Sequence, residues 1–98
     1  MSRKLDSELL RGFVAVTEAG SVSGGAKRLG RTQSAVSMQV RKLEEVAGQP
    51  LFRREARGVR LTASGEALLL RARSILGLLS EAESALTADP LVGRLSIG

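Results

Sequence analysis

Residues 31–48 have the sequence RTQSAVSMQVRKLEEVAG, which predicts one amphipathic helix with a clear start and end. The side-chain oxygen of Thr32 can accept a backbone N–H of the first turn, and Gly48 can adopt the left-handed conformation that ends a helix. Apolar side chains recur at steps of four, three and four residues and form one face: Val36, Val40, Leu43 and Ala47. One side of this helix is therefore available to a core, and the other side is left for solvent or a ligand.

The second side of the helix is polar, and short hydrogen-bonding side chains gather at its N-terminal end. Its members are Ser34, Ser37, Met38, Arg41 and Glu45, with Gln33 at the start of the helix and Lys42 next to Arg41. Such an arrangement suits a helix that enters a DNA major groove with its N-terminal end first. A helix that lies on the surface of a protein would show the same pattern, so this stretch alone leaves both interpretations open.

Positive charge is concentrated around this helix. The chain of 98 residues has a net charge of +5, but residues 27–60 alone carry nine basic and three acidic side chains. The basic members are Lys27, Arg28, Arg31, Arg41, Lys42, Arg53, Arg54, Arg57 and Arg60. The residues before and after this segment nearly balance, so the whole excess lies in the middle third of the chain. This distribution is typical of a polyanion site and favours nucleic acid over an ordinary solvated charge run.

Composition excludes several other functions. The chain has no cysteine and no histidine, which removes disulfides, thiolate or imidazole metal sites and histidine acid–base chemistry. A glycine-rich phosphate loop of the required spacing is also missing. We therefore expect no enzyme activity, no cofactor and no metal. The longest apolar run near the N-terminus covers only residues 13–16, so we expect no signal peptide or membrane span, and cysteine usage fits the cytoplasm.

Two further helices are predicted before this stretch. Asp6 can cap the first, Gly20 can end it, and its apolar face consists of Leu5, Leu9, Phe13 and Val16. Ser21 and Ser23 can open a second, short helix that Gly30 closes, with the pair Gly24-Gly25 weakening its first turn. Because only Arg31-Thr32 separates this short helix from the next one, the pair indicates a helix-turn-helix motif.

After Pro50 the pattern changes to that of a β-hairpin. Residues 51–54 and 59–62 predict two short strands around a turn that contains glycine. Inward positions are expected for Leu51, Val59 and Leu61, and outward positions for Arg53, Arg57 and Arg60. We interpret the hairpin as a wing that carries arginines to the phosphates beside the polar helix.

Residues 63–87 predict a helix about 37 Å long, with Thr62 as its cap. Apolar residues follow a heptad pattern over nearly three heptads: Leu68, Ala72, Ile75, Leu79, Ala82 and Leu86. A domain of this size has no evident internal partner for so wide a stripe, which favours a dimerisation helix. A core helix that folds back on its own domain is the alternative. Asp89-Pro90 would end the helix, and residues 94–98 alternate like a strand that is cut short.

Five short segments in this order resemble the N-terminal DNA-binding domain of LysR-type transcriptional regulators. They are LRGFVAV (10–16), TQSAVS (32–37), LEE (43–45), PLFRR (50–54) and VRLTASGEAL (59–68). The resemblance implies a winged helix-turn-helix, a linker helix that pairs in a dimer, and an effector-binding domain further along the chain. It also implies that Gln33, Ser34 and Ser37 lie at the bases and the wing arginines at the phosphates. The sequence departs from the family at Gly24-Gly25, at Met38 and at Ala63.

The predicted fold class is mainly α, a winged helix-turn-helix followed by a long dimerisation helix. Residues 1–62 would form the DNA-binding domain, 63–88 the dimerisation helix, and 89–98 a hinge with a truncated strand. The predicted function is sequence-specific binding of double-stranded DNA by a bacterial regulator, and the alternative is a winged-helix module that binds an acidic protein.

The predicted DNA-binding residues are Arg31, Thr32, Gln33, Ser34, Ser37, Met38, Arg41, Lys42, Arg53, Arg54 and Arg57, and the heptad residues above are the predicted dimer contacts. Predicted partners are an operator with partial dyad symmetry and a second copy of the chain, or a tetramer in the longer protein. A small-molecule effector would bind only to the further domain.

Overall fold

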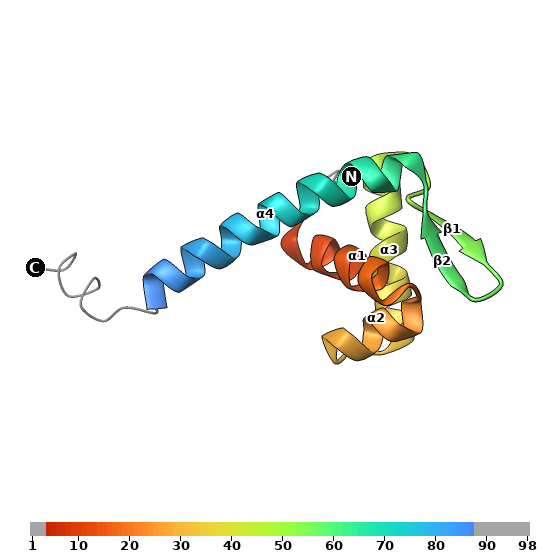
Figure 1. The fold of residues 1–98 in the computed structure, drawn as a ribbon, viewed down its shortest axis with the longest axis horizontal. Coiled ribbons are helices and arrows are strands. Elements are labelled where there is room, and N and C mark those ends of the chain that lie inside the picture. Colours follow the sequence, from red (N-terminus) through yellow and green to blue (C-terminus); the bar gives the residue numbers. More distant parts are fainter. Residues whose placement is uncertain (1–3, 88–98) are drawn as a thin grey trace, which may run out of the picture.

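The computed structural model describes residues 4–87, which form an elongated molecule measuring 56 × 28 × 23 Å. Its elements are α1 (Ser7–Ala19), α2 (Val22–Leu29), α3 (Gln33–Ala47), β1 (Phe52–Glu55), β2 (Gly58–Leu61) and α4 (Ala63–Thr87). We call α1–α3 with the hairpin the head. Figure 1 shows the hairpin projecting from one side of the helices and α4 leaving on the other. The predicted hinge and last strand lie outside the described residues.

The helices begin and end at the side chains that the sequence predicts. Capping oxygens accept backbone N–H groups of each first turn: Asp6 from Glu8 at 2.8 Å, Ser21 from Gly24 at 3.0 Å, Thr32 from Ala35 at 3.1 Å and Thr62 from Gly65 at 3.1 Å. Gly20, Gly30 and Gly48 adopt the left-handed conformation after α1, α2 and α3. Local chemistry therefore sets all these boundaries, as predicted.

The core of the head lies between the apolar faces of α1 and α3. One cluster contains Leu9, Leu10, Phe13, Leu43, Leu51 and Ala72, and a second contains Val16, Ala26, Val36 and Val40. Two predicted core positions are wrong. Leu5 is exposed because α1 begins only after its cap, and Ala47 is exposed because the buried side of α3 ends at Leu43.

Glycine at position 25 has a packing reason that the sequence analysis missed. A Cβ atom on Gly25 would lie 2.7 Å from Val16 Cγ2 and 2.9 Å from the Val16 backbone. The absence of a side chain therefore lets α2 approach α1 closely. This gain offsets the weaker helix propensity that the glycine pair was expected to impose.

The hairpin is antiparallel and leans on the helices. Phe52 pairs with Leu61 and Arg54 with Val59, so these side chains share the inner face of the hairpin. The Phe52 ring packs on Phe13 with 5.2 Å between ring centroids. The strands begin and end one residue away from the predicted limits, at Phe52–Glu55 and Gly58–Leu61, so the turn is shorter than expected.

The backbone of the hairpin is also tied to the helices. The Val59 N–H donates to the Gly20 carbonyl oxygen at 3.0 Å. Since Gly20 lies in the turn between α1 and α2, the second strand of the hairpin is fixed to that turn directly.

The first four turns of α4 pack on the head, which corrects part of the dimer prediction. Ala72 is fully buried in the main core cluster, and Leu68, Leu69 and Leu76 pack against that cluster. The alternative of a helix that folds back on its own domain therefore holds for this part of α4. Contact with the head leaves Ala72 unavailable to a second subunit.

The remaining residues of the stripe lie outside the two core clusters. Ile75 and Ala82 are exposed, Leu79 is half-buried, and the side chain of Leu86 is 81% exposed. Within residues 4–87 no helix is long and apolar enough to cross a membrane.

Candidate nucleic-acid interface

The polar side of α3 forms a shallow open recess. Its lining consists of Gln33, Ser34, Ser37, Met38 and Arg41. Ser34, Ser37, Met38 and Arg41 fall on one helix face because they are spaced by three, four and seven residues from Ser34. The sequence predicted that these side chains share one accessible face, and the structure brings them together.

A second recess joins this face to the hairpin. It is lined by Val22, Ser37, Val40, Arg41, Glu44 and Arg54. Ser37 and Arg41 belong to both recesses. The surface is therefore continuous from the first turn of α3 to the inner face of β1, where Arg54 lies.

Glu44 holds the start of the hairpin against α3, a role that the sequence analysis did not assign. Its Oε2 atom accepts the N–H of Leu51 at 2.8 Å and the N–H of Phe52 at 3.2 Å. These bonds place the hairpin relative to the polar side of α3. The available signal was an acidic residue on α3 shortly before Pro50, where the chain must leave the helix and its backbone N–H groups need new acceptors.

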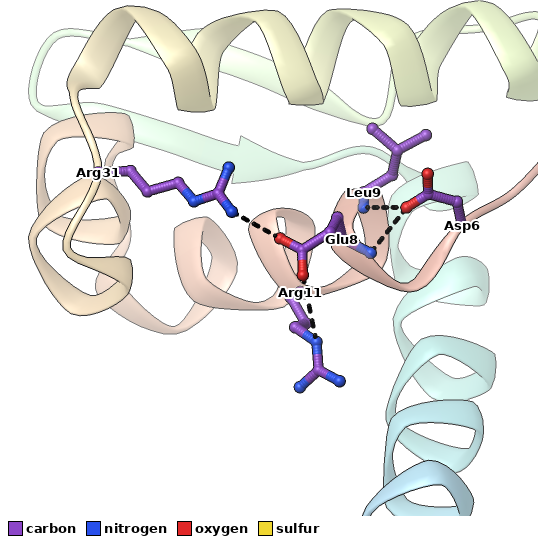
Figure 2. A network of polar contacts seen from close by, with 5 residues as sticks. All are labelled: Asp6, Glu8, Leu9, Arg11 and Arg31. Atoms are coloured by element: carbon purple, nitrogen blue, oxygen red, sulfur yellow. Dashed lines mark hydrogen bonds and ion pairs between the residues drawn. The ribbon is translucent and has the colours of Figure 1, made fainter.

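Arg31 is turned toward α1 rather than left free. Figure 2 shows its guanidinium reaching Glu8, whose second oxygen faces Arg11. The Arg31 Nη2 to Glu8 Oε1 distance is 3.0 Å, and the Arg11 Nε to Glu8 Oε2 distance is 3.9 Å. Arg31 was predicted to bind DNA, and in the free chain it has an acidic partner.

The arginines of the hairpin divide between its two faces and its turn. Arg53 stands directly opposite Arg60, on the face that points away from the helices. Like charges in this position repel, and an ion pair between Arg60 Nε and Glu55 Oε2 at 3.6 Å offsets part of the repulsion. Arg57 lies in the exposed turn. The outer face therefore concentrates positive charge where a phosphate chain could reach it.

Of the remaining predicted DNA-binding residues, Thr32 acts as the cap of α3. Lys42 is exposed on α3 and lines neither recess. Among residues 4–87, no cluster of acidic side chains could hold a metal ion.

These features define a winged helix-turn-helix protein with a long C-terminal helix. Residues 7–66 match the family model described as "Bacterial regulatory helix-turn-helix protein, lysR family". The chain belongs to this family, and the resemblance inferred from its five sequence segments is confirmed.

Regulators in two bacteria illustrate the relationship. The chain is 45% identical over 98 residues to the HTH-type transcriptional regulator DgdR of Burkholderia cepacia, covering 100% of this chain and 33% of that protein. It is 43% identical over 94 residues to PecT of Dickeya dadantii, covering 96% and 30%. The chain therefore spans about a third of the length of these relatives.

Solved structures agree with the fold. A crystal structure of the CbnR DNA-binding domain in complex with DNA superposes with a TM-score of 0.79 at 38% identity, covering 86% of this chain and 97% of that one. The BenM DNA-binding domain with catB site 1 DNA gives a TM-score of 0.80 at 30% identity, covering 96% and 99%. The predicted fold class is confirmed by these likenesses.

Proposed function

We propose that this chain binds double-stranded DNA in a sequence-specific manner, as the DNA-binding part of a LysR-type transcriptional regulator. The observation that best supports this proposal is the continuous surface that joins the polar face of α3 to the wing through Ser37 and Arg41. Its side chains match the two requirements of a DNA site, which are hydrogen-bonding groups for base edges and cations for phosphates. The CbnR and BenM structures described above are complexes with DNA and support the same function.

Within this surface we assign two roles. Gln33, Ser34 and Ser37 would contact base edges, since they lie where a recognition helix points into the major groove. Phosphates would be contacted by Arg41, Lys42, Arg53, Arg54 and Arg57. Arg31 would also contact a phosphate after its release from Glu8. Thr32 supports both roles by capping the helix that carries the base contacts.

We further propose that the chain acts as a homodimer, and as a dimer or tetramer in the whole regulator. The C-terminal half of α4 carries an apolar stripe that residues 4–87 do not bury, formed by Ile75, Leu79, Ala82 and Leu86. Ala72 is no longer part of this proposed seam, and Leu68 contacts the head instead. Two copies would present two recognition helices to an operator with partial dyad symmetry.

The proposed regulator works in the cytoplasm and has no catalytic role. Its domains would be the winged head over residues 1–62, the linker helix over 63–88 and a hinge with the start of an effector-binding domain over 89–98. A small-molecule effector would act only through that further domain.

Duplexes selected by this chain from a random-sequence library test the proposal. We expect selected duplexes to bind more tightly than scrambled ones, with an affinity that falls steeply as salt rises. Equal binding of selected and scrambled duplexes would contradict sequence specificity. Binding to an acidic protein in preference to any duplex would favour the alternative, a protein-interaction module.

A further inference from the structure

One apolar side chain lies in the middle of the polar side of α3. Met38 is 65% exposed, and among the described side chains that line the first recess it is the apolar member. A single exposed apolar residue on a protein surface needs no explanation by itself. Its position is what matters here, because the surrounding side chains are the ones that would meet base edges.

The neighbours of Met38 constrain what can lie opposite it. Ser34, Ser37 and Arg41 share its helix face, at one turn or less along α3. Each can form hydrogen bonds with a base or a phosphate, whereas a thioether is only a weak acceptor. A polar base edge pressed against Met38 would therefore lose its water without gaining a comparable partner.

In the major groove only one base offers an apolar group at its edge. Thymine carries a 5-methyl group there, whereas cytosine has only a hydrogen at that carbon and the purines present mainly donors and acceptors. Methionine is unbranched and polarisable, so its side chain can adapt to the small, exposed surface of a methyl group. The two surfaces fit each other and would remove each other from water.

We propose that Met38 is a specificity-determining residue that contacts the 5-methyl group of a thymine in each half-site. This inference rests on the proposed function, since it assigns one contact within the same DNA interface. A duplex with thymine opposite Met38 would then be preferred over one with any other base at that position.

The test removes the methyl group and nothing else. In a duplex selected by the chain, each thymine is replaced in turn by deoxyuridine, and the dissociation constant is measured by fluorescence anisotropy. We expect one position in each half-site to weaken binding about fourfold, the value for burial of one methyl-sized group. Replacement in both half-sites should weaken binding about sixteenfold, because distant contacts add.

Two variants connect the effect to Met38. With Met38→Ala, thymine and deoxyuridine duplexes should bind equally, while Met38→Leu should keep most of the preference for thymine. Leu70→Ala is the matched control, since Leu70 is equally apolar and 72% exposed but lies on α4. That control should retain the full fourfold effect. Circular dichroism verifies that all three variants remain helical.

The outcomes separate this inference from the proposed function. Absence of tight binding to any selected duplex would overturn the proposed function itself. Tight binding with no methyl-sensitive thymine, or with a sensitivity that survives in Met38→Ala, would overturn the role of Met38 and leave the proposed function standing.

Discussion

The guanidinium of Arg31 lies 3.0 Å from the carboxylate of Glu8, which ties the turn before α3 to the first turn of α1. Both side chains are about half exposed, so the pair contributes at most about 1 kcal/mol to folding. Its effect on ligand binding is more direct. A phosphate that approaches Arg31 must compete with the carboxylate that already holds it.

Replacement of that carboxylate should strengthen DNA binding. In Glu8→Gln the Arg31 side chain loses its ionic partner, so duplex affinity should rise and the slope of log K against log salt should steepen by up to about one unit. Glu81→Gln changes the net charge equally on the exposed surface of α4. Equal gains in both variants would mean that net charge, rather than release of Arg31, causes the effect.

The turn of the wing should bind DNA without sequence preference. Arg57→Ala is expected to weaken binding about equally on selected and scrambled duplexes and to flatten the salt slope by about one unit, as for one lost phosphate contact. Arg71→Ala removes the same charge from α4 and should change the slope little. A loss confined to the selected duplex would identify Arg57 as a base contact instead.

The first residue of α3 should determine base preference. Gln33→Ala should cost about 1–3 kcal/mol for each lost bidentate contact and relax the preference at two symmetric positions. Arg41 extends the surface toward Arg54, so Arg41→Ala should weaken all duplexes and leave preferences unchanged. The base preferences of both variants are measured by their binding to a panel of duplexes with single-base changes. Unchanged preferences in Gln33→Ala with altered ones in Arg41→Ala would make Arg41 the base contact and Gln33 the phosphate contact.

The free part of α4 should form the dimer interface. Leu79→Glu would place a charge in the apolar stripe beyond the head, and the dimer should weaken by several kcal/mol because that charge would be buried without a partner. Leu70→Glu is the matched control, since Leu70 faces the opposite side of the helix nine residues away. Sedimentation equilibrium measures the dimer dissociation constants of both variants and of the parent chain. A monomeric parent chain at micromolar concentration would contradict the proposed dimer, and equal dimerisation of Leu79→Glu would place the interface elsewhere.

A pair of glycine substitutions should change stability in opposite directions. Gly25→Ala brings a Cβ atom to 2.7 Å from Val16 Cγ2, and we expect a loss of about 1–3 kcal/mol in the free energy of unfolding. Gly77 lies inside α4 with nothing within 4 Å of its Cβ position. Gly77→Ala should therefore stabilise the chain by up to about 1 kcal/mol. Urea unfolding at one protein concentration compares the two, and a neutral Gly25→Ala would contradict the tight helix contact.

Sequence patterns were sufficient where structure depends on residues close together in the chain. The caps at Asp6 and Thr32 and the helix end at Gly48 follow from side chains within one turn of the boundary, so they could be predicted. The polar recess on α3 follows in the same way from helical spacing alone. Its contacts with DNA stay predictions.

Relationships between distant segments could not be predicted in this way. The burial of Ala72 depends on where α4 crosses α1, which its heptad pattern does not specify, because a stripe is apolar whichever partner covers it. Glu8 is separated from Arg31 by the rest of α1 and all of α2, and Glu44 meets the hairpin only because the chain reverses after Pro50. Each of these contacts is a product of the tertiary fold.

The head holds the first half of α4, and the second half extends beyond the head as a lever. Packing against the head ends near Leu76, and Thr87 lies about 16 Å further along the helix axis. A tilt of about 10° at Ala72 would move Thr87 by about 4 Å, close to the rise of about 3.4 Å between successive bases on one DNA strand. A rotation of this size where α4 meets the head would therefore shift the far end of the helix by roughly one base step.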